Sequence, residues 1–128
     1  EAVAADQVTA IHDPTEGGVA TGLWELARAA GVGLRIEAEA IPLVEPGAQF
    51  CEHLGLDPLG TIASGSMIIC VPWDDTANVI SAVEMAGVEC TEIGEVVPES
   101  EGIMLARNGD LEEMPTFPCD EITKIFAD

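Results

Sequence analysis

Seven residues near the start of the chain, His12 to Gly18, combine side chains and a spacing suited to holding a phosphate. They lie between a strand-like run and a helical pattern, so their paired glycines fall at the start of a helix. The first N–H groups of a helix have no partner within it, and the helix dipole favours an anion there. Gly17 and Gly18 would let a phosphate approach the backbone because they carry no side chain. Asp13 and Glu16 could orient a metal-bridged phosphate or a nucleophile, and His12 could carry protons near neutral pH.

The same residues also form a competent turn and helix cap that needs no ligand. Asp13-Pro14 ends the preceding strand because the residue before a proline favours extended backbone. A strand–loop–helix junction with two glycines is only a moderately specific signal. On the residues alone, a ligand-binding turn and a purely structural turn both remain open.

The elements that would position this turn can be read from the pattern of apolar residues. Residues 7–12 alternate as a short strand, and apolar residues recur at helical spacing from Gly18 to Ala30, with Gly31 as the C-terminal cap. Residues 32–37 indicate a second strand. Residues 40–49 indicate a loop that enters a short helix ending before Gly55.

The second half of the chain predicts more strands than helices. Residues 66–71 are apolar nearly throughout, so we expect a central strand covered on both faces. Asp74 is the predicted N-cap of a following helix. Two further strands are expected at residues 88–97 and 103–106, and a last short helix at residues 120–126. The prediction is one α+β domain, a mixed β-sheet with helices packed on it.

The charge of the chain excludes two classes of partner. With 24 acidic residues against 4 basic ones, the formal net charge is −20, which repels nucleic acid and anionic membranes. No apolar run reaches the roughly 18 to 20 residues of a membrane span. The acidity could reflect adaptation to high salt or belong to one half of a better balanced protein, and both interpretations remain open.

The cysteines give no sign of a metal or redox motif. Cys51, Cys70, Cys90 and Cys119 lie far apart and form no CxxC pair, so we predict no metal site. Reduced thiols in a cytoplasmic protein are the default expectation for such a pattern.

Three stretches resemble, in order, the C-terminal domain of the AIR-synthase-related superfamily. They are IHDPTEGGVATGLWELARAAGVGLRIEAEAIP, CEHLGLDPLGTIASGSMIICVP and VECTEIGEVV. The superfamily includes aminoimidazole ribonucleotide synthase, selenophosphate synthetase, thiamine-monophosphate kinase and the HypE-type hydrogenase-maturation proteins. The sequence is most similar to the HypE-like branch, in which a DPTxGG motif opens this half of the protein.

The resemblance implies a two-domain, dimeric protein that activates a substrate oxygen with ATP. Residues 1–128 would be its single C-terminal domain, and an amino-terminal domain outside this chain would supply most of the residues that bind ATP and Mg²⁺. The chain alone is then expected to be inactive. Its role would be to close the cleft and present the turn to phosphate.

The resemblance also implies roles for individual residues. His12 is a candidate catalytic base or substrate ligand, with Asp13 beside it, and the backbone of Gly17 and Gly18 would hold a phosphate. Asp13 and Thr15 would shape the turn. The residues expected to contribute to phosphate or substrate binding are Thr15, Glu16, Gly17, Gly18 and Ser64.

Two departures from the HypE-type pattern support a rival interpretation. Ser64 stands where those proteins carry an acidic residue, and the chain ends in KIFAD without the cysteine of their tail. Cys119 is the nearest thiol. The rival is a non-catalytic dimerisation or docking domain that has kept the fold, and a third alternative is a salt-adapted structural domain without a ligand.

Overall fold

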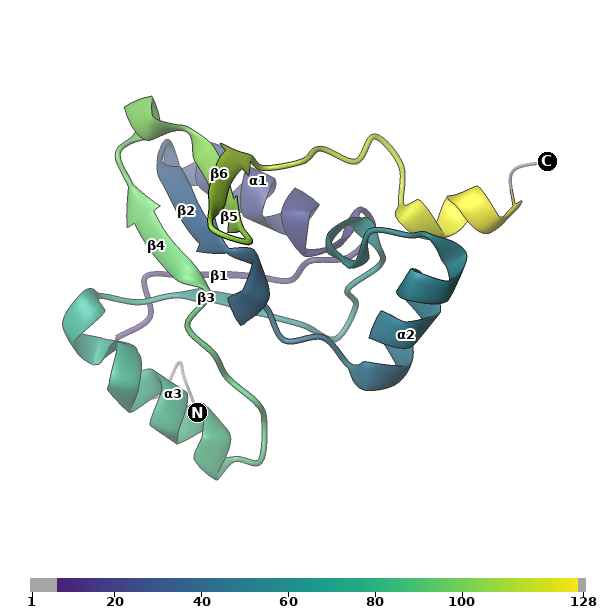
Figure 1. The fold of residues 1–128 in the computed structure, drawn as a ribbon. Helices are drawn as coiled ribbons and strands as arrows, with labels where there is room; N and C mark the ends of the chain where they lie inside the picture. Colours follow the sequence, from purple (N-terminus) through teal and green to yellow (C-terminus); the bar gives the residue numbers. More distant parts are fainter. Residues whose placement is uncertain (1–6, 127–128) are drawn as a thin grey trace.

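The computed structural model describes residues 7–126, and these form an α+β domain built on two sheets (Figure 1). Its helices and strands are β1 (Ala10–His12), α1 (Gly18–Ala30), β2 (Gly33–Glu37), α2 (Glu45–Leu54), β3 (Ile68–Cys70), α3 (Thr76–Met85), β4 (Gly94–Val97), β5 (Ile103–Arg107) and β6 (Asp110–Glu113). Short 3₁₀ segments join them, namely η2 (Ala38–Ala40), η3 (Pro58–Gly60), η4 (Trp73–Asp75), η5 (Glu99–Glu101) and η6 (Glu121–Phe126). Within residues 7–126, no helix is long and apolar enough to cross a membrane.

The larger sheet is mixed and has the strand order β4-β2-β5-β6. Strand β2 pairs antiparallel with β4 and parallel with β5, and β5 pairs antiparallel with β6. The smaller sheet contains only β1 and β3, which are antiparallel, with His12 opposite Ile68. The predicted α+β class with a mixed sheet is confirmed.

The core lies between α1 and the larger sheet. Ala20, Leu23 and Ala27 repeat at helical spacing and are buried against Leu34 and Leu105 of the sheet. Helix α1 ends at Gly31, whose φ of 66° is a left-handed conformation that glycine adopts without steric cost. Both ends of α1 match the sequence prediction, because the spacing of the apolar residues and the glycine cap indicate the same bounds.

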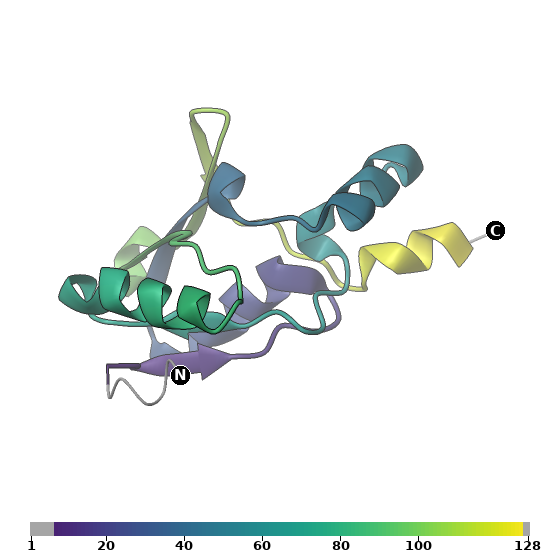
Figure 2. The same ribbon diagram turned by 90° about the horizontal axis from the view of Figure 1, so that it is seen from below.

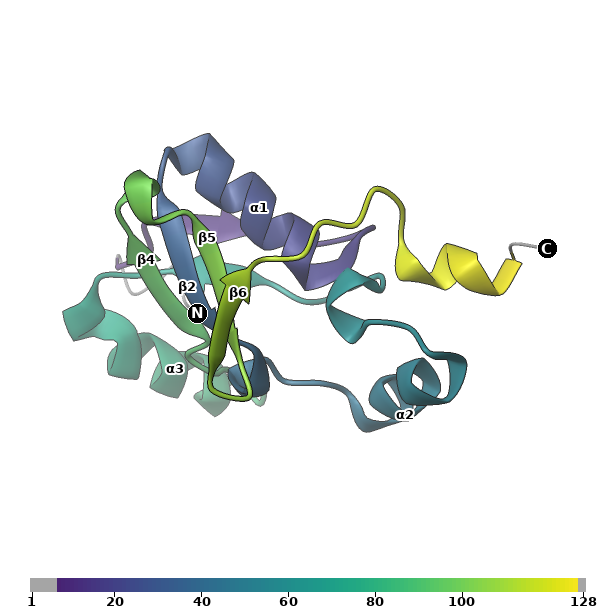
Figure 3. The ribbon, with the colours of Figure 1, turned by 45° about the horizontal axis from the view of Figure 1, so that its top comes forward.

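Segments from three parts of the sequence lie together at one end of the larger sheet. Helix α2, η3 and the C-terminal η6 project on the same side in all three views (Figures 1, 2 and 3). The amide N–H of Asp57, which precedes η3, donates to the Glu121 carboxylate in η6 over 3.0 Å. The C-terminal segment is therefore tied to the region that follows α2.

Four predictions need correction. The strand at residues 66–71 is not central, because β3 pairs only with β1 among the described strands. Asp74 is not a helix cap, since it lies inside η4 and α3 begins at Thr76. Of residues 88–97 only Gly94–Val97 form a strand, and the last helix is a 3₁₀ segment. Strand β6 was not predicted.

Candidate functional site

The predicted phosphate turn lies between β1 and the first turn of α1. Pro14 is fully buried beneath it, and Gly17 and Gly18 both have left-handed backbones, with φ of 77° and 68°. A Cβ at Gly18 would collide with the carbonyl of Leu59, and one at Gly17 would collide with the Thr21 side chain. Both glycines are therefore required by the close packing of this turn, whether or not it holds a ligand.

The amide group at the centre of the turn already binds a carboxylate. The N–H of Gly17 donates to Oδ2 of Asp120 over 2.8 Å, and Asp120 is only 8% exposed. The second carboxylate oxygen, Oδ1, accepts from the N–H of Ile122 over 3.0 Å. A carboxylate at the N-terminus of α1 is favoured by the unpaired amides and by the helix dipole. The turn therefore binds an anionic oxygen in this structure, and that oxygen belongs to the chain itself.

The second glycine of the motif is also engaged within the chain. The N–H of Gly18 donates to the carbonyl of Thr15 over 3.1 Å, which closes the turn. The same carbonyl accepts from the N–H of Ala63 over 3.2 Å. That second hydrogen bond brings the loop carrying Ser64 against the turn, so two regions separated in the sequence meet here.

The remaining side chains of the predicted site point outward. Asp13, Thr15, Glu16 and Ser64 are exposed, and within residues 7–126 their side chains make no hydrogen bond or ion pair. They are available to a ligand that approaches the turn from solvent. Their proposed roles remain predictions.

His12 stands at the end of β1 and pairs with a carboxylate on α1. Its Nε2 lies 2.8 Å from Oε2 of Glu25, and the two side chains are partly exposed. This contact fixes the orientation of the ring and leaves Nδ1 as the second nitrogen. An imidazole held by a carboxylate is an arrangement suited to moving a proton at neutral pH. A surface ion pair with no catalytic role would have the same geometry.

A second buried carboxylate, Glu121, fastens the segment that carries Asp120. Its Oε2 accepts from the N–H of Asp57 over 3.0 Å and from Nζ of Lys124 over 2.7 Å. The hydrogen bond from Asp57 and the contact with Lys124 hold the pKa of Glu121 below its usual value. The adjacent carboxylates of Asp120 and Glu121 thus bind the backbone amides of two distant residues, Gly17 and Asp57, and Asp120 also binds the amide of Ile122.

Sequence reasoning missed Asp120 and Glu121 as parts of this site. The one available signal was the prediction of a helix starting at residue 120, which agrees with an acidic cap at that position. Nothing in the sequence links that cap to a glycine 103 residues earlier. Among the described residues, no three His, Cys, Asp or Glu side chains are grouped in a way that could hold a metal ion.

The fold and this turn define a class of protein. Residues 1–106 match the family described as AIR synthase related protein, C-terminal domain, and the chain belongs to that family.

Within this class the chain is similar to the HypE proteins, as the sequence resemblance predicted. It is 38% identical over 98 residues to the carbamoyl dehydratase HypE of Azotobacter vinelandii, which covers 75% of this chain and 29% of that protein. It is 40% identical over 91 residues to the carbamoyl dehydratase HypE of Rhizobium leguminosarum bv. viciae, covering 70% of this chain and 26% of that protein. The chain thus spans less than a third of the length of these curated relatives.

Solved structures agree with the sequence relatives. The crystal structure of E. coli HypE, a hydrogenase maturation protein, matches with a TM-score of 0.81 at 31% identity, over 93% of this chain and 38% of that chain. HypE in complex with ATP matches with a TM-score of 0.79 over 89% of this chain and 37% of that chain, and its 23% identity establishes the shared fold alone.

Proposed function

We propose that this chain is the cleft-closing, phosphate-facing domain of an ATP-dependent, HypE-like carbamoyl dehydratase. The observation that carries the proposal is the hydrogen bond from Gly17 to a carboxylate oxygen. This hydrogen bond supports the inference that the turn can bind an anionic oxygen at the start of α1. A phosphate oxygen would there replace the carboxylate oxygen of Asp120. Similarity to proteins named carbamoyl dehydratase supports the choice of reaction.

Dehydration of a carbamoyl group requires its oxygen to leave and its nitrogen to lose both protons. ATP supplies the phosphoryl group with which that oxygen departs as phosphate, leaving a carbon–nitrogen triple bond. In the proposal the turn binds oxygens of the phosphate, and the exposed Thr15 and Ser64 hydroxyls can donate to it from the adjoining loop. Most of the contacts to ATP and Mg²⁺ are assigned to an amino-terminal domain outside this chain.

His12 is the proposed base for one of the nitrogen protons. Its ring is oriented by Glu25 at 2.8 Å, so the imidazolium formed on proton uptake would be stabilised by the carboxylate. Asp13, the next residue in the chain, is exposed and would orient the substrate.

The proposed partners follow from the same relatives. The chain would pack against its own ATP-binding domain in a cytoplasmic homodimer. A HypE structure solved as a HypE–HypF complex, 27% identical to this chain, supports a HypF-like protein as a further partner of the full-length enzyme.

The test is Mg²⁺-dependent ATP hydrolysis by the full-length natural protein. We expect His12→Ala to lower kcat by about 100-fold, the range typical of a removed general base. The matched control is His53→Ala, which changes the only other histidine, on α2 and away from the turn. Equal rates for the two variants would remove His12 from the mechanism. Gly17→Val should abolish hydrolysis, with urea unfolding used to show that the variant is folded.

A non-catalytic docking domain is the second candidate, and the Asp120 contact is also the observation that favours it. An amide already bound to an internal carboxylate needs no phosphate to satisfy it. Full-length protein that neither binds nor hydrolyses ATP would establish this alternative over the enzyme.

A further inference from the structure

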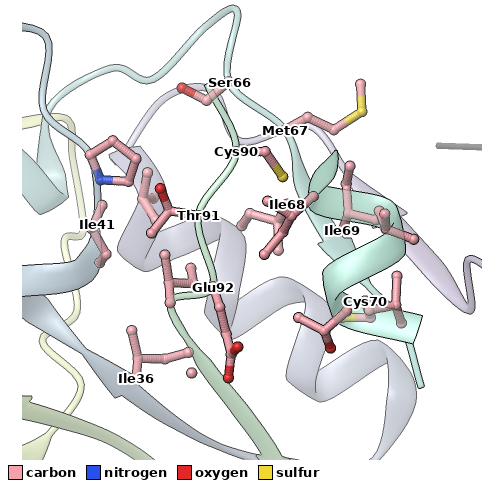
Figure 4. Close-up of a pocket in the computed structure, with 18 of the residues that line it drawn as sticks. Ile36, Ile41, Ser66, Met67, Ile68, Ile69, Cys70, Cys90, Thr91 and Glu92 are labelled. Carbon is pink, nitrogen blue, oxygen red and sulfur yellow. The ribbon is translucent and has the colours of Figure 1, made fainter. Parts of the chain in front are cut away.

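Two hollows in the described part of the chain differ in the charge of their linings. The larger, of about 860 Å³, lies between the two sheets, and its charged lining residues are Glu89, Glu92 and Glu95 (Figure 4). The smaller, of about 200 Å³, lies beside α1, and we call it the Arg28 pocket. It is lined by Thr21, Trp24, Arg28, Thr116 and Phe117, without a carboxylate, although the chain has 24 acidic residues. An anion would therefore meet a favourable charge in the Arg28 pocket and an unfavourable one in the larger hollow.

Arg28 differs from the other arginines and the lysine in having no carboxylate partner within the described part of the chain. Arg35, Arg107 and Lys124 each form at least one ion pair, whereas Arg28 forms none. Its guanidinium lies over the Trp24 ring, 5.0 Å from the ring centroid, and a guanidinium in that position keeps its N–H groups for other acceptors. Arg28 is exposed in the last turn of α1, where the helix dipole favours a positive charge. The pocket therefore presents an oriented guanidinium to a ligand.

The two aromatic rings of the pocket are held by contacts to other segments. The indole Nε1 of Trp24 donates to the carbonyl of Met114 over 3.4 Å, which joins α1 to the segment that carries Thr116 and Phe117. The ring of Phe117 packs directly on Gly60 of η3, where a Cβ would collide with it. The walls of the pocket are therefore set by the fold, and a pre-formed site loses less free energy to ordering when it binds a ligand.

The lining of the Arg28 pocket determines the class of ligand that fits it. A guanidinium binds the paired oxygens of a carboxylate or a phosphate through two parallel hydrogen bonds, and the hydroxyls of Thr21 and Thr116 can donate to the same group. The rings of Trp24 and Phe117 offer apolar surface on which a planar group can pack. A volume of about 200 Å³ lies below the range of drug-sized sites, which favours a ligand of about one ring.

We propose that the Arg28 pocket binds a small planar anion, a ring that carries a carboxylate or a phosphate group. The anionic group would bind Arg28, and the ring would pack against Phe117. The proposal does not depend on the function proposed above, because none of the lining residues belongs to the turn at residues 12–18. The pocket is nevertheless a neighbour of that turn, since a Cβ at Gly17 would meet the side chain of Thr21. A ligand in the pocket would therefore lie beside the turn without occupying it.

Isothermal calorimetry on the full-length natural protein tests the proposal with three probes. Benzoate and phenyl phosphate carry the two anionic groups, and benzamide is a neutral counterpart of benzoate with nearly the same shape. We expect at least one of the two anions to bind at least about tenfold more tightly than benzamide, because the amide cannot form the charge-assisted hydrogen bonds. Tighter binding of benzoate would identify carboxylates as the ligand class, and tighter binding of phenyl phosphate would identify phosphates. Equal affinities for the three probes, or no binding of either anion, would overturn the proposal.

A pair of variants assigns the binding to this pocket. Arg28→Gln removes the guanidinium and should weaken anion binding by at least about tenfold. The matched control is Arg35→Gln, which makes the same change in net charge on β2, outside the pocket, and should leave the affinity within about twofold. Arg28 is exposed, so its variant should fold, and urea unfolding checks this. Unchanged affinity in Arg28→Gln, or equal losses in the two variants, would overturn the proposal.

Discussion

The carboxylate of Asp120 lies 2.8 Å from the amide nitrogen of Gly17, and this hydrogen bond joins the C-terminal segment to the start of α1. Both residues are buried, and Asp120 also caps η6 through the amide of Ile122. One carboxylate therefore stabilises the first turns of two segments that lie at opposite ends of the chain.

Removing the Asp120 carboxylate should destabilise the chain. Asp120→Ala leaves the buried Gly17 amide without an acceptor, and we expect the free energy of unfolding to fall by about 1–3 kcal/mol. Urea denaturation measures this directly. The matched control is Asp74→Ala, which removes an exposed carboxylate with no hydrogen bond among the described residues and should change stability by less than about 0.5 kcal/mol. Equal losses would show that the contact contributes nothing specific.

The same variant should expose an anion site. If phosphate replaces the carboxylate at the Gly17 amide, Asp120→Ala should bind inorganic phosphate about tenfold more tightly than the natural chain, a difference of about 1.4 kcal/mol. Isothermal calorimetry on the folded variants measures the difference. Asp74→Ala is again the control, because it makes the same change in net charge away from the turn. Equal phosphate affinity in the two variants would mean that the turn is not a phosphate receptor.

Local pattern in the sequence was enough to predict α1 and its caps. The apolar residues of α1 recur at one period, and Gly31 marks the end, so both bounds agree with the structure. Strand β6 was missed because all four of its residues are exposed, and it therefore carries no alternation of apolar and polar side chains. Its pairing with β5 is a tertiary effect that a single run of residues does not show.

The sequence predicted only the part of the site that is formed by neighbouring residues in the chain. Residues 12–18 were identified as one turn because they are contiguous, and the resemblance added Ser64 before the structure placed its loop on the Thr15 carbonyl. The carboxylates of Asp120 and Glu121 were missed because their partners, Gly17 and Asp57, are distant in the sequence. Long-range hydrogen bonds of this kind depend on the packed fold, and no spacing rule predicts them.

Alanine substitutions at Gly18 and Gly31 distinguish the cost of a left-handed backbone from the cost of a steric collision. Both have a left-handed backbone, with φ of 68° and 66°, but only Gly18 has neighbouring atoms where a Cβ would stand. Gly31→Ala should therefore cost about 1–2 kcal/mol, the penalty of that conformation for an L-residue. Gly18→Ala should cost clearly more, because its Cβ also meets the carbonyl of Leu59. Urea unfolding of both variants provides the comparison, and equal losses would show that the turn can move away from η3.

Glu121 should make stability depend on pH in the acid range. The Asp57 amide and Lys124 hold the pKa of this carboxyl below its usual value in the folded chain. A lowered pKa adds stability that is fully present above the unfolded value of about 4.3 and is lost as the pH falls through the folded value. Glu121→Gln keeps an oxygen for the Asp57 amide but cannot ionise. The stability difference between the natural chain and this variant should therefore be largest near pH 7 and shrink below about pH 4.

Urea unfolding at several pH values tests this prediction, with Glu52→Gln as the control. Glu52 is exposed on α2 and makes no ion pair within the described residues, so its replacement accounts for the general effect of removing one negative charge. A difference for Glu121→Gln that stays constant from pH 7 to about pH 3 would contradict the assignment, because the carboxylate would then contribute no pH-dependent stability. If the stability difference from the natural chain shrinks on acidification for Glu121→Gln but not for Glu52→Gln, the loss of stability in acid comes from the contact between η6 and Asp57.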